Sequence, residues 1–314
     1  MRYFKYFLLV LITGIGFLDL TYVLFRRGYN KFNSFEQTRL REIISGKENY
    51  AVLFLGSSRT FHHVNPKIID SSLKINSYNA GIDGANIAEV ALVLKCYLAS
   101  HPKPKVIVAD ISTPFFDIKE NPLFNSNIYY PFLNNEIVYN TMKPFKRVGL
   151  LRFFPFLQIP ECDDFLREGA VQGLLGKEKR LEPHYKGHLE SGKDTIPLPF
   201  KVKYLTTDYP VSGKGTTYLY EIIKICKDNN IQLLLTYSPV YKLKDEKLNP
   251  DFFPTIIRIA DSSGVQFLNY RKIPLTYNNK LFRDELHLNT YGANIFSAIL
   301  ANDLKSRIDM ALLQ

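Results

Sequence analysis

Three residues near opposite ends of the sequence carry side chains that could together activate a nucleophile. Ser58 follows the apolar run "AVLFL" (51–55) within "LGSSRT", and Asp284 and His287 stand three positions apart in "FRDELHLN". A serine hydroxyl becomes a nucleophile when a histidine takes its proton, and a carboxylate can fix the tautomer of that histidine. A loop or single turn is enough to bring Asp284 to the His287 ring. The residue types therefore predict acyl transfer through a serine.

Each of these pieces also has a purely structural interpretation. Serine is common at the amino terminus of a helix, so a glycine turn followed by Ser58 need only start a helix. Asp284 and His287 could decorate a helix entry that Asn289 or Thr290 caps. The conjunction of a serine after the first strand with an acid–histidine pair before the last helix favours the chemical interpretation.

A glycine-containing loop supplies a third piece. "SYNAGIDGAN" (77–86) holds Gly81 and Gly84 after the second apolar run of the chain. Glycines let backbone amides approach a reacting group closely, and amides aimed at a developing oxyanion lower the barrier to acyl transfer. The alternative is a strand-to-helix turn that needs glycine for a positive φ.

The pattern of apolar runs predicts the element order that must position these residues. Short runs without alternation are typical of strands covered on both faces of a parallel sheet, and helical patterns lie between them. The alternation indicates an α/β fold, a doubly wound and mostly parallel five-stranded sheet. The expected strands cover residues 51–55, 75–80, 105–111, 231–238 and 265–270, and the expected helices cover 85–100, 216–230 and 252–264.

The amino terminus predicts a membrane anchor. Residues 6–25 are apolar except for Asp19, and as a helix of 20 residues they would span about 30 Å, the thickness of a bilayer core. A cleaved signal peptide is the alternative, but no small-residue cleavage site follows the apolar stretch. We assign residues 1–30 to the anchor and 31–314 to the α/β domain. Cations flank both ends of the stretch, so charge does not give its orientation.

A long insertion is expected at about residues 114–212, after the third strand. This region is rich in Pro, Phe and Tyr, has helical patterns and lacks a clear strand alternation. Insertions at the carboxyl ends of strands often build substrate clefts in α/β folds. Three roles stay open: capping the active site, lying on the membrane, or packing an aromatic core of its own.

Composition narrows the classes of partner. The net charge is +10, from 40 Lys and Arg against 30 Asp and Glu. These cations are spread along the chain without a nucleic-acid-binding motif, so we expect no nucleic acid and attribute the charge to nearby phospholipid headgroups. The three cysteines have no metal-ligand spacing, and neither do the other histidines, so no metal and no cofactor are expected. These remaining histidines are His62, His63, His101, His184 and His188.

Together the three blocks resemble the SGNH/GDSL hydrolase superfamily. Its Gly-Asp-Ser-like block corresponds to "GSS", which puts the nucleophile at Ser58 and leaves Ser57 where the family has an acid. Its Asn-Ala-x-Ile-x-Gly block is similar to "NAGIDG", so the oxyanion glycine is Gly84. Its Asp-x-x-His block matches Asp284 as orienter and His287 as base.

The resemblance covers most of residues 50–112 and 216–305 and implies a flavodoxin-like sheet, serine esterase or O-acyltransferase activity and no cofactor. One block departs from the family. The family usually has an oxyanion asparagine after the third strand, whereas "VIVADISTPFF" has none. The oxyanion hole would then have fewer donors, or Ser57, Arg59 or the insertion would complete it.

In its missing asparagine and its amino-terminal anchor, the chain is similar to a membrane-anchored branch of the superfamily. That branch includes the teichoic-acid D-alanylation and alginate acetylation proteins. That resemblance implies an extracytoplasmic domain, in the periplasm or at the cell surface, that acts on a surface or exported polysaccharide. An integral-membrane acyltransferase is the implied partner. Two other functions stay open: a non-catalytic protein that binds glycan or escorts an acyltransferase, and a lipid-active esterase. An α/β-hydrolase would need glycine in place of Thr60 and is excluded.

Overall fold

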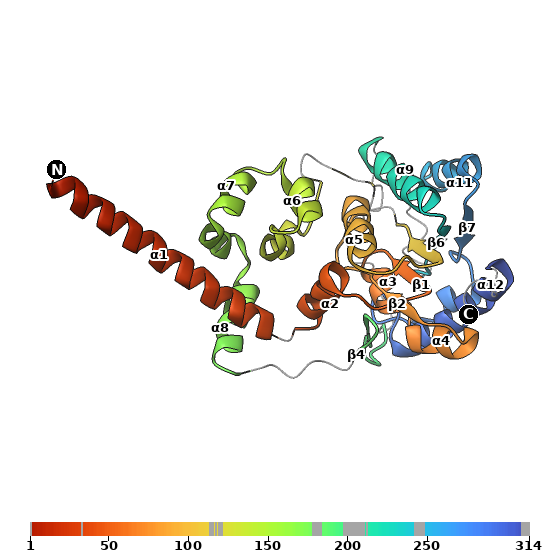
Figure 1. Cartoon of the computed structure of the whole chain (residues 1–314). Coiled ribbons are helices and arrows are strands. Elements are labelled where there is room, and N and C mark those ends of the chain that lie inside the picture. Colours follow the sequence, from red (N-terminus) through yellow and green to blue (C-terminus); the bar gives the residue numbers. More distant parts are fainter. Residues whose placement is uncertain are drawn as a thin grey trace. The chain divides into compact units, whose positions relative to one another are not determined.

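The computed structural model divides the chain into two compact units, which we treat separately. The helical unit combines Met1–Thr38 with Asn125–Glu182, and the α/β unit combines Arg39–Phe124 with Pro183–Gln314. Figure 1 traces both along the chain. The structure describes residues 2–32, 34–112, 116, 118, 122–177, 184–196, 211, 213–241 and 249–308.

The α/β unit is built on five parallel strands in the order β2-β1-β3-β6-β7. Every residue of the first three strands in the chain is buried, as expected for apolar runs covered on both faces. The predicted sheet is confirmed. The strands are β1 (Val52–Leu55), β2 (Ser77–Asn79), β3 (Val106–Asp110), β6 (Gln232–Tyr237) and β7 (Gln266–Asn269).

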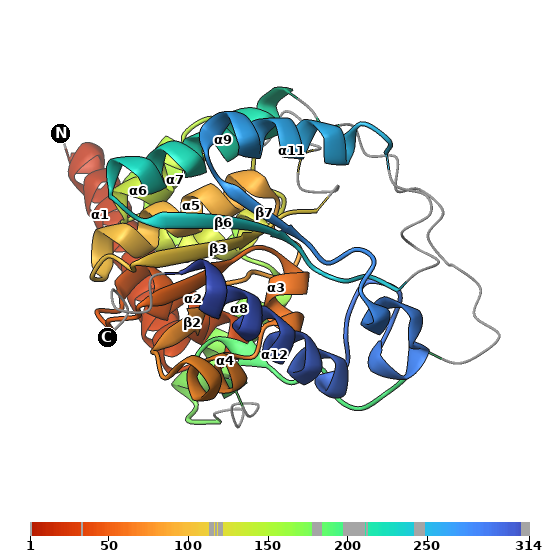
Figure 2. The same cartoon turned by 90° about the vertical axis from the view of Figure 1, so that its right-hand side faces the viewer.

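Helices cover both faces of this sheet, with α5, α9 and α11 on one side and α4 and α12 on the other (Figure 2). Local signals start several of them: Asn86 and Glu89 form a capping box on α5, and Asn289 caps α12. The predicted helices are confirmed to within a few residues. The helices of this unit are α3 (Ser58–His63), α4 (Pro66–Leu73), α5 (Ile87–Ser100), α9 (Gly213–Asp228), α11 (Phe252–Ser263) and α12 (Thr290–Arg307), with α2 (Phe35–Ser45) crossing the unit boundary.

Short elements complete the unit beside its sheet. A two-stranded antiparallel ribbon follows the helical unit in sequence, and two turns of 3₁₀-helix precede α12. The ribbon lies inside the segment predicted as an insertion. Its strands are β4 (His184–Tyr185) and β5 (His188–Leu189), and the turns are η4 (Pro274–Tyr277) and η5 (Asn279–Leu281).

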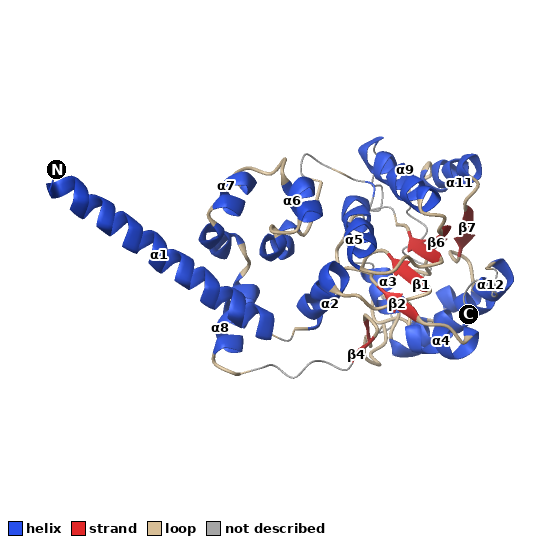
Figure 3. Ribbon diagram, viewed as in Figure 1, coloured by secondary structure: helices blue, strands red, loops and turns tan. Residues whose placement is uncertain are grey.

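The described elements of the helical unit are all helices (Figure 3). Its first helix is long and apolar enough to cross a membrane. Residues 25 and 29 of that helix and residue 32 just after it are buried, whereas the helix residues before 25 are largely exposed. The elements are α1 (Arg2–Lys31), η2 (Ser126–Phe132), α6 (Glu136–Met142), α7 (Val148–Phe153), η3 (Pro155–Glu161) and α8 (Asp164–Leu174).

Candidate active site

The turn after β1 presents Ser58 at the carboxyl edge of the sheet. The strand ends at Leu55, and Ser58 is the first residue of α3. Gly56 between them has a φ of +152°, and a Cβ there would overlap the Thr60 hydroxyl. That hydroxyl donates to the Leu55 carbonyl at 3.1 Å. Glycine is therefore required for the chain to turn this tightly into α3.

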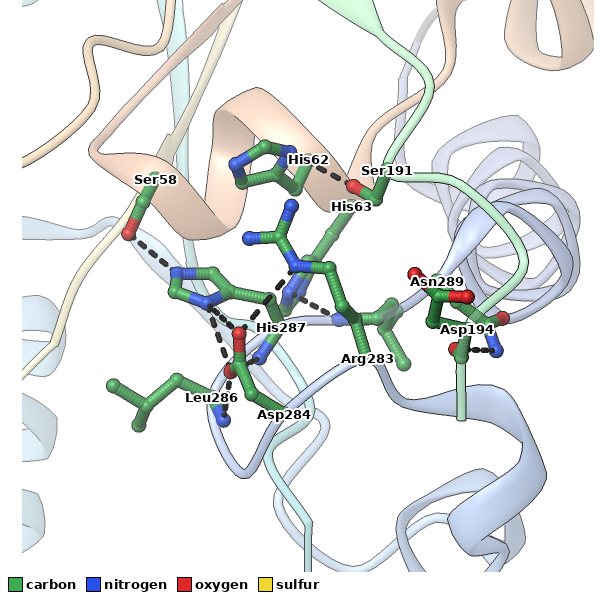
Figure 4. A network of polar contacts seen from close by, with 11 residues as sticks. Ser58, His62, His63, Ser191, Asp194, Arg283, Asp284, Leu286, His287 and Asn289 are labelled. Carbon is green, nitrogen blue, oxygen red and sulfur yellow. Dashed lines mark hydrogen bonds and ion pairs between the residues drawn. The ribbon is translucent and has the colours of Figure 1, made fainter. Parts of the chain in front are cut away.

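Ser58, His287 and Asp284 form one hydrogen-bonded chain (Figure 4). The Ser58 Oγ lies 2.9 Å from His287 Nε2, and His287 Nδ1 lies 2.9 Å from each carboxylate oxygen of Asp284. With the proton on Nδ1, the ring donates to Asp284 and leaves Nε2 free to accept from Ser58. The arrangement has the geometry of a nucleophile, a base and an orienting carboxylate.

The loop before α12 holds Asp284 in its ionised form. Its Oδ1 accepts from the amides of Leu286 and His287, both at 2.9 Å. Partial burial pushes the pKa of Asp284 upward, but the hydrogen bonds and the charge of His287 outweigh it and lower the pKa to about 2. The carboxylate therefore stays available to His287 across the ordinary pH range.

The predicted oxyanion donors are the backbone amides of Ser58 and Gly84. The Ser58 amide is the first of α3, and Gly84 lies in an exposed turn with a φ of +69°. Neither amide donates to a described residue. The Gly84 loop is tied to the Ser58 turn because Ile82 N donates to the Gly56 carbonyl at 3.0 Å. A Cβ on Gly81 would come within 3.0 Å of the Ser57 carbonyl oxygen, so glycine permits this approach.

Arg59 points into the protein. Its side chain is 4% exposed, and the guanidinium donates to the carbonyls of Ile111 at 2.6 Å and Ser238 at 3.2 Å. It also pairs with Asp110 at 3.1 Å. These partners hold the Arg59 guanidinium at the carboxyl ends of β3 and β6.

Asp110 is the last residue of β3 and lies at the carboxyl edge of the sheet. Its Oδ1 accepts from the Ser238 amide at 2.6 Å and the Thr236 hydroxyl at 3.4 Å. Burial raises the pKa of Asp110, and the neighbouring Arg59 opposes that rise. The side chains of Ser57 and Ser112 are also buried here, and Thr113 lies outside the described residues.

Asn79 connects the glycine loop to the nucleophile helix, a role that the motif alone did not reveal. Its Nδ2 donates to the carbonyls of Thr60 and Val64, both at 2.7 Å, and its Oδ1 accepts from Gly81 N at 3.0 Å. Asn79 is fully buried. Its place at the head of "NAGIDG" is the sequence signal that could have found it.

His63 supports the loop that carries the base. Its Nε2 accepts from Leu288 N at 3.0 Å, and its ring centroid lies 6.3 Å from that of His287. Burial first, and then the charges of His287 and Arg59, lower the pKa of His63 well below its usual value. A neutral ring is what an acceptor requires. Nothing in the spacing of His63 pointed to Leu288.

Residues 188–196 contact α3 at Phe61 and His62. Ser191 Oγ lies 2.8 Å from His62 Nδ1, and the Gly192 carbonyl accepts from Thr290 N at 2.9 Å. His188 Nδ1 lies 3.2 Å from the carbonyl of Phe61. Although this segment falls within the predicted insertion, it braces both the nucleophile helix and the start of α12. In the described parts of the chain, no group of three His, Cys, Asp or Glu residues is arranged to hold a metal.

Comparison with known proteins gave matches among solved structures. No family model and no curated protein matches the chain. A protein assigned to the G-D-S-L lipolytic family, from Desulfitobacterium hafniense DCB-2, superposes with a TM-score of 0.42 at 10% identity, covering 81% of this chain and 99% of that one. A protein described as an acylhydrolase, from Bacteroides fragilis NCTC 9343, gives a TM-score of 0.41 at 11% identity, covering 88% and 95%.

Proposed function

We propose that this protein is a serine-dependent esterase or O-acyltransferase of the SGNH type. One observation carries the proposal: Ser58 Oγ, His287 and Asp284 are linked through contacts of 2.9 Å at the carboxyl edge of a parallel sheet. Ligands of open α/β sheets bind outside this edge. The three blocks that resemble the SGNH/GDSL superfamily all lie on this unit.

In the proposed reaction, His287 Nε2 takes the Ser58 proton as Oγ attacks the carbonyl carbon of an ester or thioester. The tetrahedral intermediate collapses, the bond to the leaving group breaks, and His287 returns the proton to that group. Water or a sugar hydroxyl then attacks the acyl-Ser58 ester by the same proton transfers in reverse order. Asp284 holds the ring and offsets its positive charge throughout.

The amides of Ser58 and Gly84 are the proposed oxyanion donors. Losing one such donor typically raises the barrier by about 2.7–4 kcal/mol. Asp110 supplies no amide N–H₂ group where the family has asparagine, so we assign oxyanion binding to these backbone groups.

We further propose that α1 anchors the enzyme and that the α/β unit acts outside the cytoplasm on acyl groups of a surface polysaccharide. Phe25, at the end of the apolar stretch, is buried within the helical unit together with Tyr29 and Phe32, so cleavage after the stretch would remove Phe25 from that core. This favours an uncleaved anchor over a signal peptide. An integral-membrane acyltransferase is the proposed donor of the acyl group.

Two alternatives have an observation in their favour. The Asp110–Arg59 pair in place of an asparagine would suit a non-catalytic protein that binds glycan or escorts an acyltransferase. The exposed aromatic side chains of the helical unit would suit an esterase that acts on lipids, which predicts a preference for long acyl chains.

Labelling with a fluorophosphonate probe tests the proposal on the full chain in detergent. The wild type should label, Ser58→Ala should not, and the neighbouring Ser57→Ala should retain labelling as the matched control. Turnover of nitrophenyl esters from acetyl to palmitoyl then separates a polymer-modifying enzyme, which should prefer short chains, from a lipid esterase. Equal labelling of the wild type and Ser58→Ala would remove Ser58 from the mechanism.

A further inference from the structure

The last third of α1 is fixed within the helical unit. Tyr22 Oη lies 3.2 Å from Gln158 Oε1 on η3, and Arg26 donates to the carbonyl of Pro131. Farther along, Tyr29 is fully buried. Before Tyr22, the apolar side chains of α1 are largely exposed over a length that would cross a bilayer. The helical unit therefore begins on α1 where the apolar stretch ends.

The contacts between α1 and α8 show that the two helices run in opposite directions. Phe32, directly after α1, packs edge-on against Phe165 at the start of α8, with ring centroids 5.3 Å apart. Gly28 of α1 lies against Ala170 and Leu174 near the end of α8, where a Cβ on Gly28 would overlap the Ala170 carbonyl. The carboxyl end of α8 therefore lies toward the apolar part of α1, and its amino end lies away from it.

The charges on α1 mark the level of the bilayer surface. Arg26 and the exposed Arg27 follow directly on the apolar stretch, where cations meet phospholipid headgroups. Tyr22, which contacts η3, and Gly28, which contacts α8, lie on either side of this pair and are separated by about 9 Å along the helix. Parts of η3 and α8 therefore lie at headgroup depth.

Exposed apolar side chains gather on the elements at this level. Phe153, the last residue of α7 and two positions before η3, is 78% exposed, and Leu175, directly after α8, is 64% exposed. Figure 1 shows α8 beside the end of α1, and α7 packs against η3, which itself contacts α1. Asp163 caps the other end of α8, where Asp164 pairs with Arg167, whereas Lys177 follows two residues after Leu175.

We propose that the helical unit docks on the phospholipid bilayer that α1 spans, with Phe153 and Leu175 entering the interface. Aromatic side chains favour this depth of a membrane, and leucine gains free energy by leaving water. The proposal rests on α1 as an anchor and is independent of the chemistry at Ser58. Docking of the helical unit on the bilayer would hold α1 at a fixed depth in the membrane.

The absence of tryptophan from the sequence allows a direct test. Single variants Phe153→Trp, Leu175→Trp, Phe17→Trp and Phe165→Trp are made in the full chain and reconstituted in vesicles of phosphatidylglycerol with plain or brominated phosphatidylcholine. Bromine on the acyl chains quenches tryptophan only within the bilayer. Circular dichroism checks that each variant keeps the helical content of the wild type.

We expect brominated lipid to reduce the fluorescence of the Phe17, Phe153 and Leu175 variants. Phe165→Trp, at the other end of α8, should keep its fluorescence and is the matched control. If Phe17→Trp is quenched while Phe153→Trp and Leu175→Trp are not, docking is overturned and the anchor stands. If brominated lipid does not quench Phe17→Trp either, both the docking proposal and the anchor are overturned. Ester turnover in the same samples reports on the proposed chemistry separately.

Two further outcomes would assign the face to something other than lipid. Quenching of Phe165→Trp as strong as that of Leu175→Trp would mean that the membrane meets another side of the unit. Shielding of Phe153→Trp from both brominated lipid and aqueous iodide, increasing with protein concentration, would assign the face to a second copy of the chain. Either result overturns the proposal.

Discussion

The α/β unit and the helical unit differ in the interactions that hold their elements together. The first carries the candidate active site, and the second carries the apolar helix α1. In the α/β unit, directional hydrogen bonds from buried side chains such as Asn79 and Arg59 set the angles between the loops at the sheet edge. In the helical unit, small residues bring helices together: Gly28 of α1 meets Gly173 of α8 so closely that a Cβ on either would overlap the other helix. Directional bonds orient the side chains of the candidate site, whereas close packing of small residues, together with the hydrogen bonds of Tyr22 and Arg26, fixes α1 in its unit.

The largest expected effect concerns the chemistry of the α/β unit alone. Asp284→Asn should lower kcat by about 10⁴-fold, because the amide can no longer hold His287 in the tautomer that accepts from Ser58. Membrane association should be unchanged, since α1 belongs to the other unit. Turnover of a nitrophenyl ester and vesicle flotation measure the two properties. Wild-type kcat in this variant would reject Asp284 as the orienter.

In the helical unit, the substitution that tests the packing of small residues is Gly28→Ala. Because the added Cβ would overlap the Ala170 carbonyl, overpacking should destabilise the contact of α1 and α8 by about 1–3 kcal/mol. Limited proteolysis in detergent should show faster cleavage of the helical unit at unchanged ester turnover. Gly149→Ala is the control, because the nearest atom to its Cβ is the Tyr139 hydroxyl at 3.8 Å. Equal proteolysis of the two variants would argue against close packing.

A smaller effect is expected at His63, a buried side chain that supports the loop of His287 without belonging to the Ser58–His287–Asp284 hydrogen-bonded chain. His63→Leu leaves the Leu288 amide without its acceptor, which should cost about 1–3 kcal/mol of unfolding free energy and lower kcat more than it changes KM. His63→Gln keeps an acceptor and should restore part of both. Denaturant unfolding and steady-state kinetics measure these effects. A Leu variant with wild-type kcat would make His63 structural only.

The last prediction concerns the acid sensitivity of the α/β unit. Burial first, and then the charge of Arg283, lower the pKa of His62 from 6.5 to about 2. Below pH 6.5 the unfolded chain binds a proton at His62 that the folded chain does not, so acid favours unfolding and the stability present above pH 6.5 falls as the pH decreases toward 2.

His62→Gln should therefore flatten the dependence of unfolding free energy on pH by about 1.4 kcal/mol per pH unit between about pH 4.5 and 5.5. Thermal unfolding followed across this range, with the partly buried His184 replaced in a control variant, measures the change. An unaltered slope would show that His62 is protonated in the folded chain.

The sequence predicted the sheet, and it indicated the candidate catalytic residues, because both leave signals over short distances. Unalternating apolar runs report strands buried on both faces, and the Asp-x-x-His spacing closes on itself within one loop. The contact of His63 with Leu288 leaves no such signal, since its partners are separated by 225 positions. The same holds for the Arg59 guanidinium, which the sequence placed near substrate and the fold directs at Asp110.

The predicted insertion illustrates the limit of composition. Its abundance of Pro, Phe and Tyr indicated irregular and helical structure, but not which part would pack with which unit. Residues 125–182 group with α1, whereas residues 184–196 belong with the α/β unit and brace α3 and α12. The bounds of the anchor and of the insertion as domains stay predictions.

The sequence by itself determined the order of strands and helices, the apolar stretch of α1 and the local pairing of Asp284 with His287, because each depends on neighbours along the chain. Only the tertiary structure decided that Ser58 would meet His287 across 229 positions, that Arg59 would turn inward and that α8 would run antiparallel to α1. Those outcomes depend on which buried surfaces pack together, and packing is a property of the whole fold.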